Sequence, residues 1–300
     1  MNKLVSVVIP TYSRPDFICR AIESVLKQSY KPIEIIVVDD NGRGSENQVY
    51  TEKVLSHFIE ANQINYIVHE YNKNGSAARN TGAKYSHGEY ITFLDDDDVL
   101  LPQKIEKQVS AIEQNPENTA SYTGFRIIKD SKVLKEVVPI KKGCLHYDIL
   151  SLTWGIGTGS NPLYKKDVFD FVNGFDESFI RHQDIEFLVR FFRKNSIINV
   201  PEVLIERYID SRINSVNYQK FITVKEKFLA TFKDDIEKYP FWMQRTIYRN
   251  HFADIACHAM QAKAYKTALQ YYRKANSYKL LSLKIIVKGL LFGFAGRSVE

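Results

Sequence analysis

The side chains best suited to hold a cation or move a proton in this 300-residue chain are carboxylates, and they are densest in the run Asp95-Asp96-Asp97-Asp98. This run follows the β-branched and aromatic stretch Glu89–Leu94, which is typical of a strand. Adjacent carboxylates repel one another unless a cation compensates them, and their oxygens suit Mg²⁺ or Mn²⁺. The alternative is a solvated acidic turn before the helix expected near Pro102, and we favour such a helix-terminal role for Asp98.

Two further carboxylate positions stand at the ends of predicted elements. Asp39-Asp40 follows the apolar run 33–38, and Asp184 precedes an amphipathic helical pattern over Phe187–Lys194. A carboxylate at Asp184 could accept the proton of an attacking hydroxyl, or it could cap the helix that follows. Asp40, beside Asn41-Gly42, has the composition of a turn.

The elements that must position these carboxylates alternate along the first hundred residues. Strand patterns over 4–9, 33–38, 64–69 and 89–94 alternate with helical patterns over 17–27, 49–61 and 75–85, with Ser76 as the expected N-cap of the last helix. This alternation predicts an α/β fold with a mostly parallel sheet and helices on both faces. Ligands of such sheets bind beyond the carboxyl ends of the strands, where the acidic residues stand.

The second half of the chain predicts a change of architecture. A helix is expected from Pro102 to Gln114, antiparallel strands over 120–128 and 132–138, a strand over 203–208, and helices over 220–276, the last two forming a helical hairpin. We therefore expect a mixed sheet with a C-terminal helical extension. The predicted domains are 1–205, divided into halves 1–102 and 103–205, and 206–300.

A glycine-rich segment, Trp154–Asn161, lies between the later strands. It lacks the lysine followed by Ser/Thr that a phosphate-binding loop requires. We interpret it as a flexible loop in which Trp154 offers an aromatic platform for a ligand, and packing of Trp154 in the core is equally consistent with its type.

Composition excludes several classes. Three widely spaced cysteines argue against a disulfide framework or a zinc site, and a strand pattern within a few residues of Met1 leaves no room for a signal peptide, so we expect a cytoplasmic protein. Of the formal charge of +6, residues 263–300 carry eight basic residues against Glu300 alone. Apolar residues interleave with lysines over 280–294, which favours a helix lying in the interface of an anionic membrane. The alternatives are a membrane span, for which the segment is too short and too charged, nucleic-acid binding, packing against the protein and a homo-oligomer contact.

Several motifs in order resemble the inverting family 2 glycosyltransferases. The resemblance lies in Val5–Tyr12, Val37–Asn41, Asn74–Gly82 with its Ala-Arg-Asn-Thr-Gly, Phe93–Asp98, and Gly174–Glu177 with Gln183-Asp184. It implies a GT-A fold, in which a Rossmann-like nucleotide-binding half is fused to an acceptor-binding half. It also implies a metal-dependent, hexosyltransferase-type reaction that moves a sugar from a nucleotide diphosphate, for which we favour UDP, to a hydroxyl of a saccharide acceptor.

The resemblance also implies site roles, position by position. Asp184 corresponds to the catalytic base, Asp97 with Asp95 to the ligands of Mn²⁺ or Mg²⁺, and Trp154 and Gln183 are acceptor-side candidates. Asp39 corresponds to the residue that accepts a hydrogen bond from the base. The nucleotide-sugar-binding positions are Thr11, Tyr12, Arg14, Asp39, Arg79, Asp95 and Asp96.

The chain departs from the family pattern at two places. Gln183 stands where the family commonly has glutamate, and no histidine occurs in Arg207–Asn217, where Arg212 is left to contact phosphate. With the basic tail, the resemblance favours a lipid-linked acceptor at the inner face of the cell membrane, in cell-surface polysaccharide synthesis. The alternatives are a nucleotidyltransferase, which Pro10–Pro15 disfavours because it lacks glycine, and an inactive nucleotide-binding or membrane scaffold.

Overall fold

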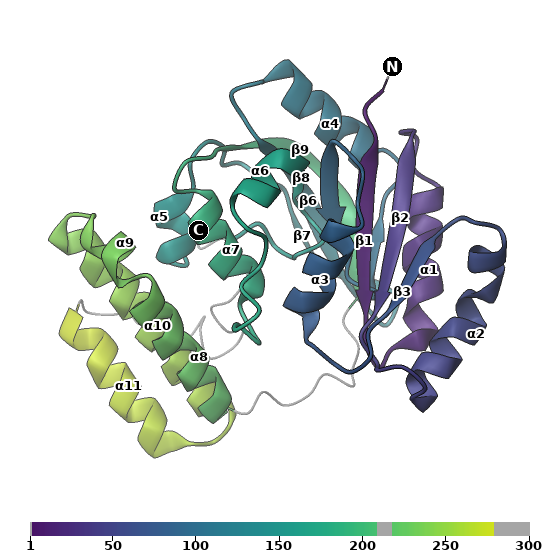
Figure 1. Ribbon diagram of the computed structural model, residues 1–300. Coiled ribbons are helices and arrows are strands. Elements are labelled where there is room, and N and C mark those ends of the chain that lie inside the picture. The colour runs from purple at the N-terminus through teal and green to yellow at the C-terminus, as the bar shows by residue number, and fades with distance from the viewer. Residues whose placement is uncertain (1, 209–217, 279–300) are drawn as a thin grey trace. The chain divides into compact units, whose positions relative to one another are not determined.

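The computed structural model describes residues 2–208 and 218–278, and these fall into two compact units. Unit 1 comprises Met1–Leu145 and Ile156–Ser211, and unit 2 comprises His146–Gly155 and Arg212–Glu300. Figure 1 labels their elements. The predicted domain boundary after residue 205 stays a prediction. In the structure the short segment His146–Gly155 groups with the C-terminal helices. The predicted contacts of Arg212 and of the basic tail over 280–294 lie outside the described residues.

The first half of unit 1 is the predicted parallel sheet. Its four strands lie in the order β3-β2-β1-β4, and every neighbouring pair is parallel. Because β1 and β2 pair from Val5↔Ile33 to Thr11↔Asp39, their carboxyl ends meet at one edge of the sheet. The bounds are β1 Val5–Thr11, β2 Ile33–Asp39, β3 Asn65–Val68 and β4 Tyr90–Phe93.

The second half continues the same sheet with mixed strand directions. Within the described residues the full order is β3-β2-β1-β4-β8-β6-β9-β5, with β7 pairing β6 beside this path. The pairs β4–β8, β8–β6, β6–β7 and β9–β5 are antiparallel, whereas β6 and β9 are parallel. The predicted mixed sheet is confirmed. The bounds are β5 Asp98–Leu100, β6 Ala120–Lys129, β7 Lys132–Val137, β8 Leu163–Lys165 and β9 Ile197–Tyr208.

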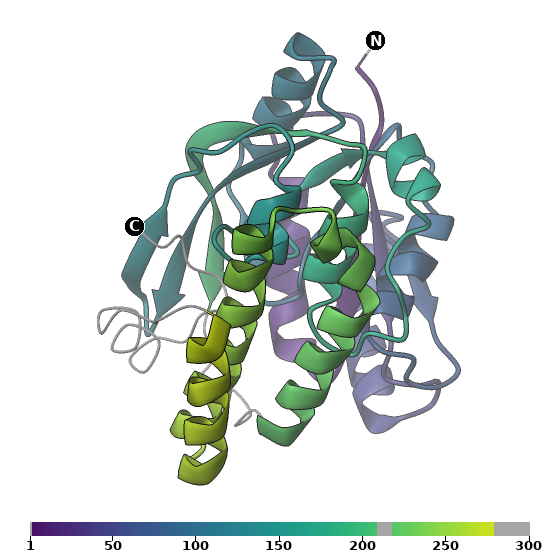
Figure 2. The same ribbon diagram turned by 90° about the vertical axis from the view of Figure 1, so that its left-hand side faces the viewer.

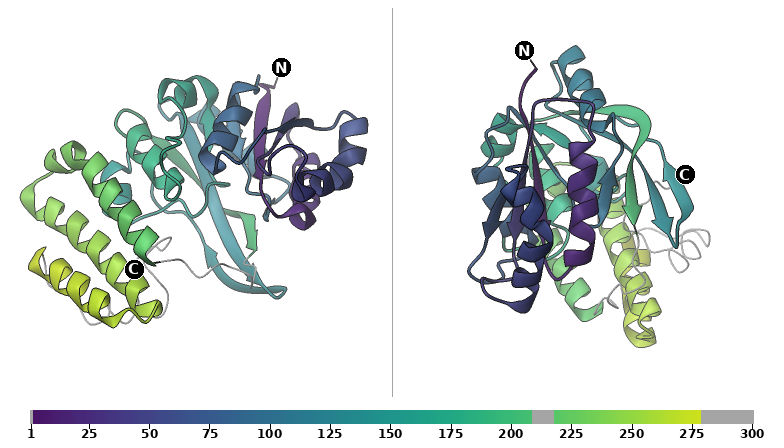
Figure 3. Two further views of the ribbon diagram at one scale, coloured as in Figure 1. Left: turned by 60° about the horizontal axis from the view of Figure 1, so that its bottom comes forward. Right: turned by 90° about the vertical axis from the view of Figure 1, so that its right-hand side faces the viewer.

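The two faces of β1 pack against different helices, as the strand's two-residue period requires. Val5, Val7 and Ile9 lie in a core cluster with residues of α1, α2 and α4, whereas Val8 faces α3. A Cβ at Gly82 of α3 would overlap the Val8 side chain, so only glycine allows this close approach. Figure 3 shows α1 in front of β1 in its right-hand view. The bounds are α1 Pro15–Leu26, α2 Glu46–Glu60, α3 Gly75–Lys84 and α4 Lys104–Gln114.

An aromatic cluster joins β4 and β8 to the helices α6 (Lys166–Phe171) and α7 (Gln183–Phe191). Phe93 lies 5.2 Å from Phe169 and 5.1 Å from Phe175, measured between ring centroids, and Phe187 lies 5.0 Å from Phe175. Tilted and edge-to-face aromatic pairs at these separations are favourable beyond the area they bury. The cluster fixes α7, which carries Gln183 and Asp184, on the sheet.

Two local predictions are wrong. Asp98 begins strand β5 and pairs with Arg207 of β9, so it is not a helix-terminal carboxylate, because α4 begins only at Lys104. The N-cap of α3 is Asn74, not Ser76: Asn74 adopts φ 81° and its side chain accepts hydrogen bonds from the backbone N–H groups of Ser76 and Ala77. Asparagine tolerates this left-handed backbone better than most residues.

Unit 2 is helical, as the sequence predicts for the extension. Helices α10 and α11 form the expected hairpin, and α8 lies beside α10 (Figures 1 and 2). Asn250 of α10 donates to Ser151 O at 2.6 Å, which ties the segment after α5 to the helices. Among the described residues no helix is both long and apolar enough to cross a bilayer. The bounds are α5 His146–Leu150, α8 Tyr218–Thr231, α9 Lys233–Glu237, α10 Phe241–Gln261 and α11 Tyr265–Tyr278.

Candidate active site

An open pocket of about 280 Å³ lies in unit 1 at the carboxyl ends of the parallel strands. It is lined by the loop after β1, by the start of α3 and by the first two residues of the acidic run. Six of the seven predicted nucleotide-sugar-binding residues line it, and Asp39 does not. The six are Thr11, Tyr12, Arg14, Arg79, Asp95 and Asp96. Tyr12 is 52% exposed, so its ring is accessible for stacking.

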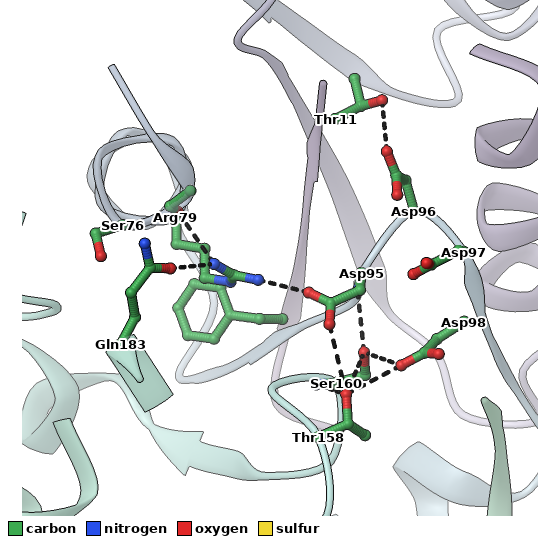
Figure 4. A network of polar contacts seen from close by, with 12 residues as sticks. Thr11, Ser76, Arg79, Asp95, Asp96, Asp97, Asp98, Thr158, Ser160 and Gln183 are labelled. Carbon is green, nitrogen blue, oxygen red and sulfur yellow. Dashed lines mark hydrogen bonds and ion pairs between the residues drawn. The ribbon is translucent and has the colours of Figure 1, made fainter. Parts of the chain in front are cut away.

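Asp95 is held from three directions, as Figure 4 shows. Arg79 Nη2 lies 2.5 Å from Asp95 Oδ1, Thr158 Oγ1 donates to Asp95 Oδ2 at 3.4 Å, and the backbone N–H of Asp95 donates to Ser160 Oγ at 3.0 Å. Burial raises the pKa of Asp95, but the Arg79 guanidinium, with the charges of Arg207 and Arg14, outweighs burial and holds that pKa below the ordinary value. Asp95 is therefore a charged carboxylate.

Asp96 and Asp97 are joined to the loop after β1. Thr11 Oγ1 donates to Asp96 Oδ2 at 2.8 Å, and Arg14 pairs with Asp97 and lies 3.4 Å from Asp96 Oδ1. Burial raises the pKa of Asp96 to about 7, against the opposing effect of Arg14. Asp97 is 26% exposed, and its pKa is also raised by burial. Since Arg14 contacts both carboxylates, one cation compensates part of the repulsion within the run.

Asp98 points into the glycine-rich loop. Ser160 Oγ donates to Asp98 Oδ2 at 2.6 Å and Thr158 Oγ1 at 3.1 Å (Figure 4), while burial, with the charge of Asp95 next, raises the pKa of Asp98 to about 7. Ser160 and Thr158 are buried at 0% and 5% exposure. Residues 156–161 therefore form a largely buried, hydrogen-bonded support for the acidic strand end, which the interpretation of this segment as a flexible loop did not anticipate.

Asn161 anchors that loop to β6. Its Oδ1 accepts from Thr123 N at 2.8 Å, and its Nδ2 donates to Thr123 O at 2.8 Å and to Ile156 O at 2.6 Å. Lys104 lies beside it, fully buried: Nζ donates to Asn161 O at 3.1 Å and to Gln108 Oε1 at 2.6 Å. Burial lowers the pKa of Lys104 to about 7. A buried ammonium thus supports the loop through neutral acceptors.

Asp39 and Asp40 differ in their hydrogen-bond partners and in their position relative to the pocket. Asp39 is fully buried and accepts from Tyr66 Oη at 2.7 Å and from the side-chain and backbone N–H groups of Asn41. Asp40 lines the pocket and accepts from Asn72 Nδ2 at 2.9 Å and from the backbone of residues 73 and 74. Base recognition by Asp39 stays a prediction, and Asp39 is not among the residues that line the pocket. Asp40 fixes the loop ahead of α3, as a turn residue should.

Asp184 lies on the first turn of α7, directly after Gln183. Gln183 Oε1 accepts from Arg79 Nη1 at 3.1 Å (Figure 4), so α7 and the acidic run share one guanidinium. The pKa of Asp184 is raised by burial, opposed in part by Arg79. His182, not Asp184, occupies the N-cap position of α7, so the capping alternative for Asp184 is wrong. Glu186 pairs with Arg190, four residues further along α7, at 2.5 Å.

Trp154 belongs to unit 2 and is 7% exposed, which favours the packing interpretation over a sugar platform. Ser160, Thr158, Asp40 and Lys104 are the contributors that sequence reasoning missed. Hydroxyl residues next to glycines, in Gly157-Thr158-Gly159-Ser160, are the signal that could have pointed to Thr158 and Ser160.

The acidic run can accommodate a divalent cation only with help from a ligand. Among the residues with described positions, no three His, Cys, Asp or Glu side chains cluster as metal ligands. However, Asp96 Oδ1 is buried without a hydrogen-bond partner, and Asp95 and Asp97 keep 29% and 26% of their side chains exposed. Mg²⁺ commonly takes one or two carboxylates and completes its shell with substrate phosphates and water. The donor set fits that mode.

The fold and the site together define an α/β protein with a mixed sheet and an acidic pocket at the carboxyl ends of its parallel strands. Residues 6–172 match the family model "Glycosyl transferase family 2". The chain belongs to this family.

Curated relatives agree with this membership. The chain is 34% identical over 193 residues to the amylovoran biosynthesis glycosyltransferase AmsB of Erwinia amylovora, covering 62% of each protein. It is 31% identical over 194 residues to UDP-Glc:alpha-D-GlcNAc-diphosphoundecaprenol beta-1,3-glucosyltransferase WfgD of Escherichia coli, covering 65% of this chain and 72% of WfgD. The alignment with AmsB thus spans about three fifths of that relative.

Solved structures confirm the predicted GT-A fold. TarS 1–349 of S. aureus in complex with UDP-GlcNAc superposes with a TM-score of 0.61 at 16% identity, over 91% of this chain and 90% of TarS 1–349. The mannosyltransferase PcManGT of Pyrobaculum calidifontis, in complex with GDP-Man and Mn²⁺, gives a TM-score of 0.55 at 16% identity, over 96% of this chain and 87% of PcManGT. At these identities the likeness concerns the fold alone.

Proposed function

We propose that this chain is an inverting, metal-dependent glycosyltransferase that moves a sugar from a nucleotide diphosphate, UDP in preference to other nucleotides, to a hydroxyl of a saccharide acceptor. The observation that carries the proposal is the shared guanidinium of Arg79, which joins the acidic residue Asp95 to Gln183, the neighbour of Asp184. Arg79 thus contacts both the proposed donor site and the helix that carries Asp184, the proposed catalytic base.

The donor would occupy the pocket beside the acidic run. Tyr12 offers an exposed ring for stacking on the base, and Arg79 and Arg14 offer planar donors for the diphosphate. Asp97 and Asp95 would hold Mn²⁺ or Mg²⁺, which supplies Lewis-acid stabilisation of the departing diphosphate when bound. Asp39 is proposed for the base because a carboxylate can accept the imide N–H of uracil.

Asp184 would accept the proton of the acceptor hydroxyl as that hydroxyl attacks the anomeric carbon. Its pKa, which burial raises, lies closer to neutral pH than that of an exposed aspartate, and a stronger base takes the proton more readily. Gln183 accepts a hydrogen bond from Arg79 and is proposed for the acceptor side, whereas Trp154 is a weaker acceptor candidate because it is buried.

The acceptor is proposed to be lipid-linked, and the reaction to serve cell-surface polysaccharide synthesis. Support comes from the names of the relatives, since WfgD acts on a diphosphoundecaprenol-linked saccharide and AmsB belongs to amylovoran biosynthesis. We propose a cytoplasmic protein bound to the inner face of the membrane, in part through the basic residues beyond position 262, with a homo-oligomer as a further possibility for that segment.

Calorimetric titration of UDP, GDP and dTDP, each with and without Mn²⁺, tests the donor site. We expect the wild type to bind UDP best, and only with the metal, and Asp97→Ala to lose this binding. Asp234→Ala, at an exposed aspartate of unit 2, is the matched control and should bind like the wild type. Absence of metal-dependent binding to any of the three nucleotides would remove the proposal.

A second experiment tests the base. Asp184→Asn should keep metal-dependent nucleotide binding and lose turnover by about a thousandfold or more, since proton transfer contributes on the order of 10²–10⁴ in rate. Turnover equal to that of the wild type would remove Asp184 from the role of base while leaving the donor site intact.

A further inference from the structure

Exposed aliphatic side chains gather on one hairpin of unit 1. In the described part of the chain seven valine, leucine and isoleucine side chains are exposed, and four of them lie within eight residues. These four are Val133 at 52%, Leu134 at 58%, Val138 at 47% and Ile140 at 69% exposure. Single exposed apolar residues are common on protein surfaces, but a cluster of this kind indicates a contact.

The same hairpin is rich in lysine. Between Lys129 and Lys142 the chain carries five lysines against Asp130 and Glu136, and Lys129, Lys132 and Lys142 are exposed. Residues 1–262 as a whole are close to neutral, with the positive charge of the chain residing in residues 263–300. The hairpin is therefore a local positive patch, and its apolar side chains stand among the charges.

The hairpin lies at the side of the sheet. Strand β7 pairs only with β6 among the described strands, so its other edge is open, and Asp130 and Ser131 turn the chain with φ of 48° and 60°. Figure 3 shows the two strands extending to the margin of unit 1 in its left-hand view. The register of the β6–β7 pair shifts between Ile127 and Ile128. Ile127 pairs with Lys135 and Ile128 pairs with Val133, so Leu134 has no partner and forms a β-bulge. The bulge explains why two consecutive apolar residues are both exposed.

An open edge strand can also recruit a strand from a second copy of the chain. Lysines and bulges on edge strands are the features that oppose such pairing, because like charges meet across the new pair and the bulge twists the edge away. Both features are present in β7. They do not oppose contact with a lipid surface, where lysines meet lipid phosphates and apolar side chains enter the boundary between headgroups and acyl chains.

We propose that residues 129–142 form a membrane-docking surface for anionic bilayers, in which Val133, Leu134 and Ile140 enter the interface and Lys129, Lys132 and Lys142 contact lipid phosphates. The surface lies outside the donor pocket, and none of these residues lines it. This inference deepens the proposed function by adding a second membrane contact, in the described part of unit 1, to the contact proposed for the basic tail.

Vesicle binding by the full chain tests the surface without donor, metal or acceptor, so that its failure is separate from failure of the transferase proposal. Phosphatidylglycerol–phosphatidylcholine vesicles are compared with phosphatidylcholine alone. We expect Val133→Ser with Leu134→Ser to bind the anionic vesicles at least fivefold more weakly than the wild type. Val49→Ser with Leu269→Ser makes the same chemical change at positions 56% and 48% exposed and should bind like the wild type.

A fluorophore locates the contact even where the tail also binds. Leu134→Cys carrying an environment-sensitive dye, in a Cys144→Ser background because Cys144 is exposed, should shift to the blue on anionic vesicles. The dye at Val49→Cys should not shift. Because all these positions are exposed, far-UV circular dichroism should confirm that the variants fold.

Equal vesicle binding by the hairpin and control variants, with no shift of the dye at position 134, would overturn the proposal. A wild-type dimer in solution that Val133→Ser with Leu134→Ser makes monomeric, without any change in vesicle binding, would also overturn it and would assign the edge to a second copy of the chain.

Discussion

Arg79 Nη2 lies 2.5 Å from Asp95 Oδ1, while Nη1 of the same guanidinium donates to Gln183 Oε1 at 3.1 Å. One side chain of α3 therefore connects the acidic end of β4 to the first turn of α7. Because Gln183 is neutral, Arg79 keeps its ion pair with Asp95 without a second carboxylate competing for it. The charge at position 183 is thus expected to influence both the donor site and Asp184.

Gln183→Glu should move the pH dependence of turnover. A second carboxylate beside Asp184 raises the pKa of that group further, and a base acts only when deprotonated, so activity should be lost at a higher pH on acidification. We expect the acid limb of the kcat/KM profile to shift upward by about one pH unit. Gln114→Glu, at an exposed position on α4, is the control. Superimposable profiles for all three proteins would contradict the role of Gln183.

Ser160→Ala should lower the metal-dependent affinity of the acidic site for UDP more than it lowers the free energy of unfolding. The mutation removes the donor to Asp98 Oδ2 at 2.6 Å and the acceptor for the N–H of Asp95, and leaving buried polar groups unpaired costs about 1–3 kcal/mol. We expect metal-dependent UDP affinity, measured by calorimetry, to fall about tenfold, with Ser110→Ala as the control. An unchanged affinity would show that the loop does not position the carboxylates.

Lys104 should make the free energy of unfolding depend on pH. Its pKa is about 7 in the folded chain against 10.5 for the ordinary group, so the unfolded state binds the proton more tightly between these values. Stability should therefore rise as pH increases from about 7 to about 10, by an amount on the order of a few kcal/mol.

Urea unfolding at several pH values measures this effect. Lys104→Met should flatten the dependence, whereas Lys53→Met, at an exposed lysine, should retain it. If Lys104→Met and the wild type show the same slope over this range, the buried ammonium is not its source.

The buried pair in unit 2 should behave differently from a surface pair. Lys225 Nζ lies 2.8 Å from Asp254 Oδ2 and both side chains are fully buried, so losing one partner leaves an uncompensated charge and costs about 3–5 kcal/mol. We expect Lys225→Met or Asp254→Asn to lower the free energy of unfolding by that amount, and Lys225→Met with Asp254→Leu to recover much of it.

The exposed pair Lys233–Glu237 provides the comparison, because surface pairs contribute about 0–1 kcal/mol. Burial raises the pKa of Asp254, but Lys225 and His258 together outweigh burial and hold the pKa below the ordinary value. The contribution of the pair is therefore present above the unfolded carboxyl pKa and is lost as pH falls below it. A double variant no more stable than the single variants would contradict this account.

The parallel half of the fold could be predicted because each of its elements carries its own periodicity. Apolar runs such as 33–38 are long enough to identify a strand, and the carboxylates at the strand ends indicated the edge of the sheet at which the pocket lies. The roles of Thr11 and Arg79 at the pocket followed from the family motifs, and the structure brings both to the acidic run.

The rest depended on contacts between distant residues. Strand β5 is only three residues long and exists because Asp98 pairs with Arg207, more than a hundred positions away, so local propensity favoured a helix-terminal role instead. The loop that holds Asp95 and Asp98 has no periodicity, and its order comes from Asn161 and the buried Lys104. Neither contact leaves a signal in the local sequence.

The hydrogen bonds from the Asn161 side chain to the backbone of Thr123 and Ile156 also limit the length of the loop. The Asn161 amide donates to the carbonyl oxygens of Ile156 and Thr123. The hydroxyls of Thr158 and Ser160, which contact the acidic run, lie between Ile156 and Asn161 in the sequence. Inserting a single residue between Ile156 and Asn161 would break either the hydrogen bonds of the Asn161 side chain or the hydrogen bonds to the carboxylates. Diversity of substrates among proteins built on this plan should therefore arise outside residues 156–161, in segments free to change length.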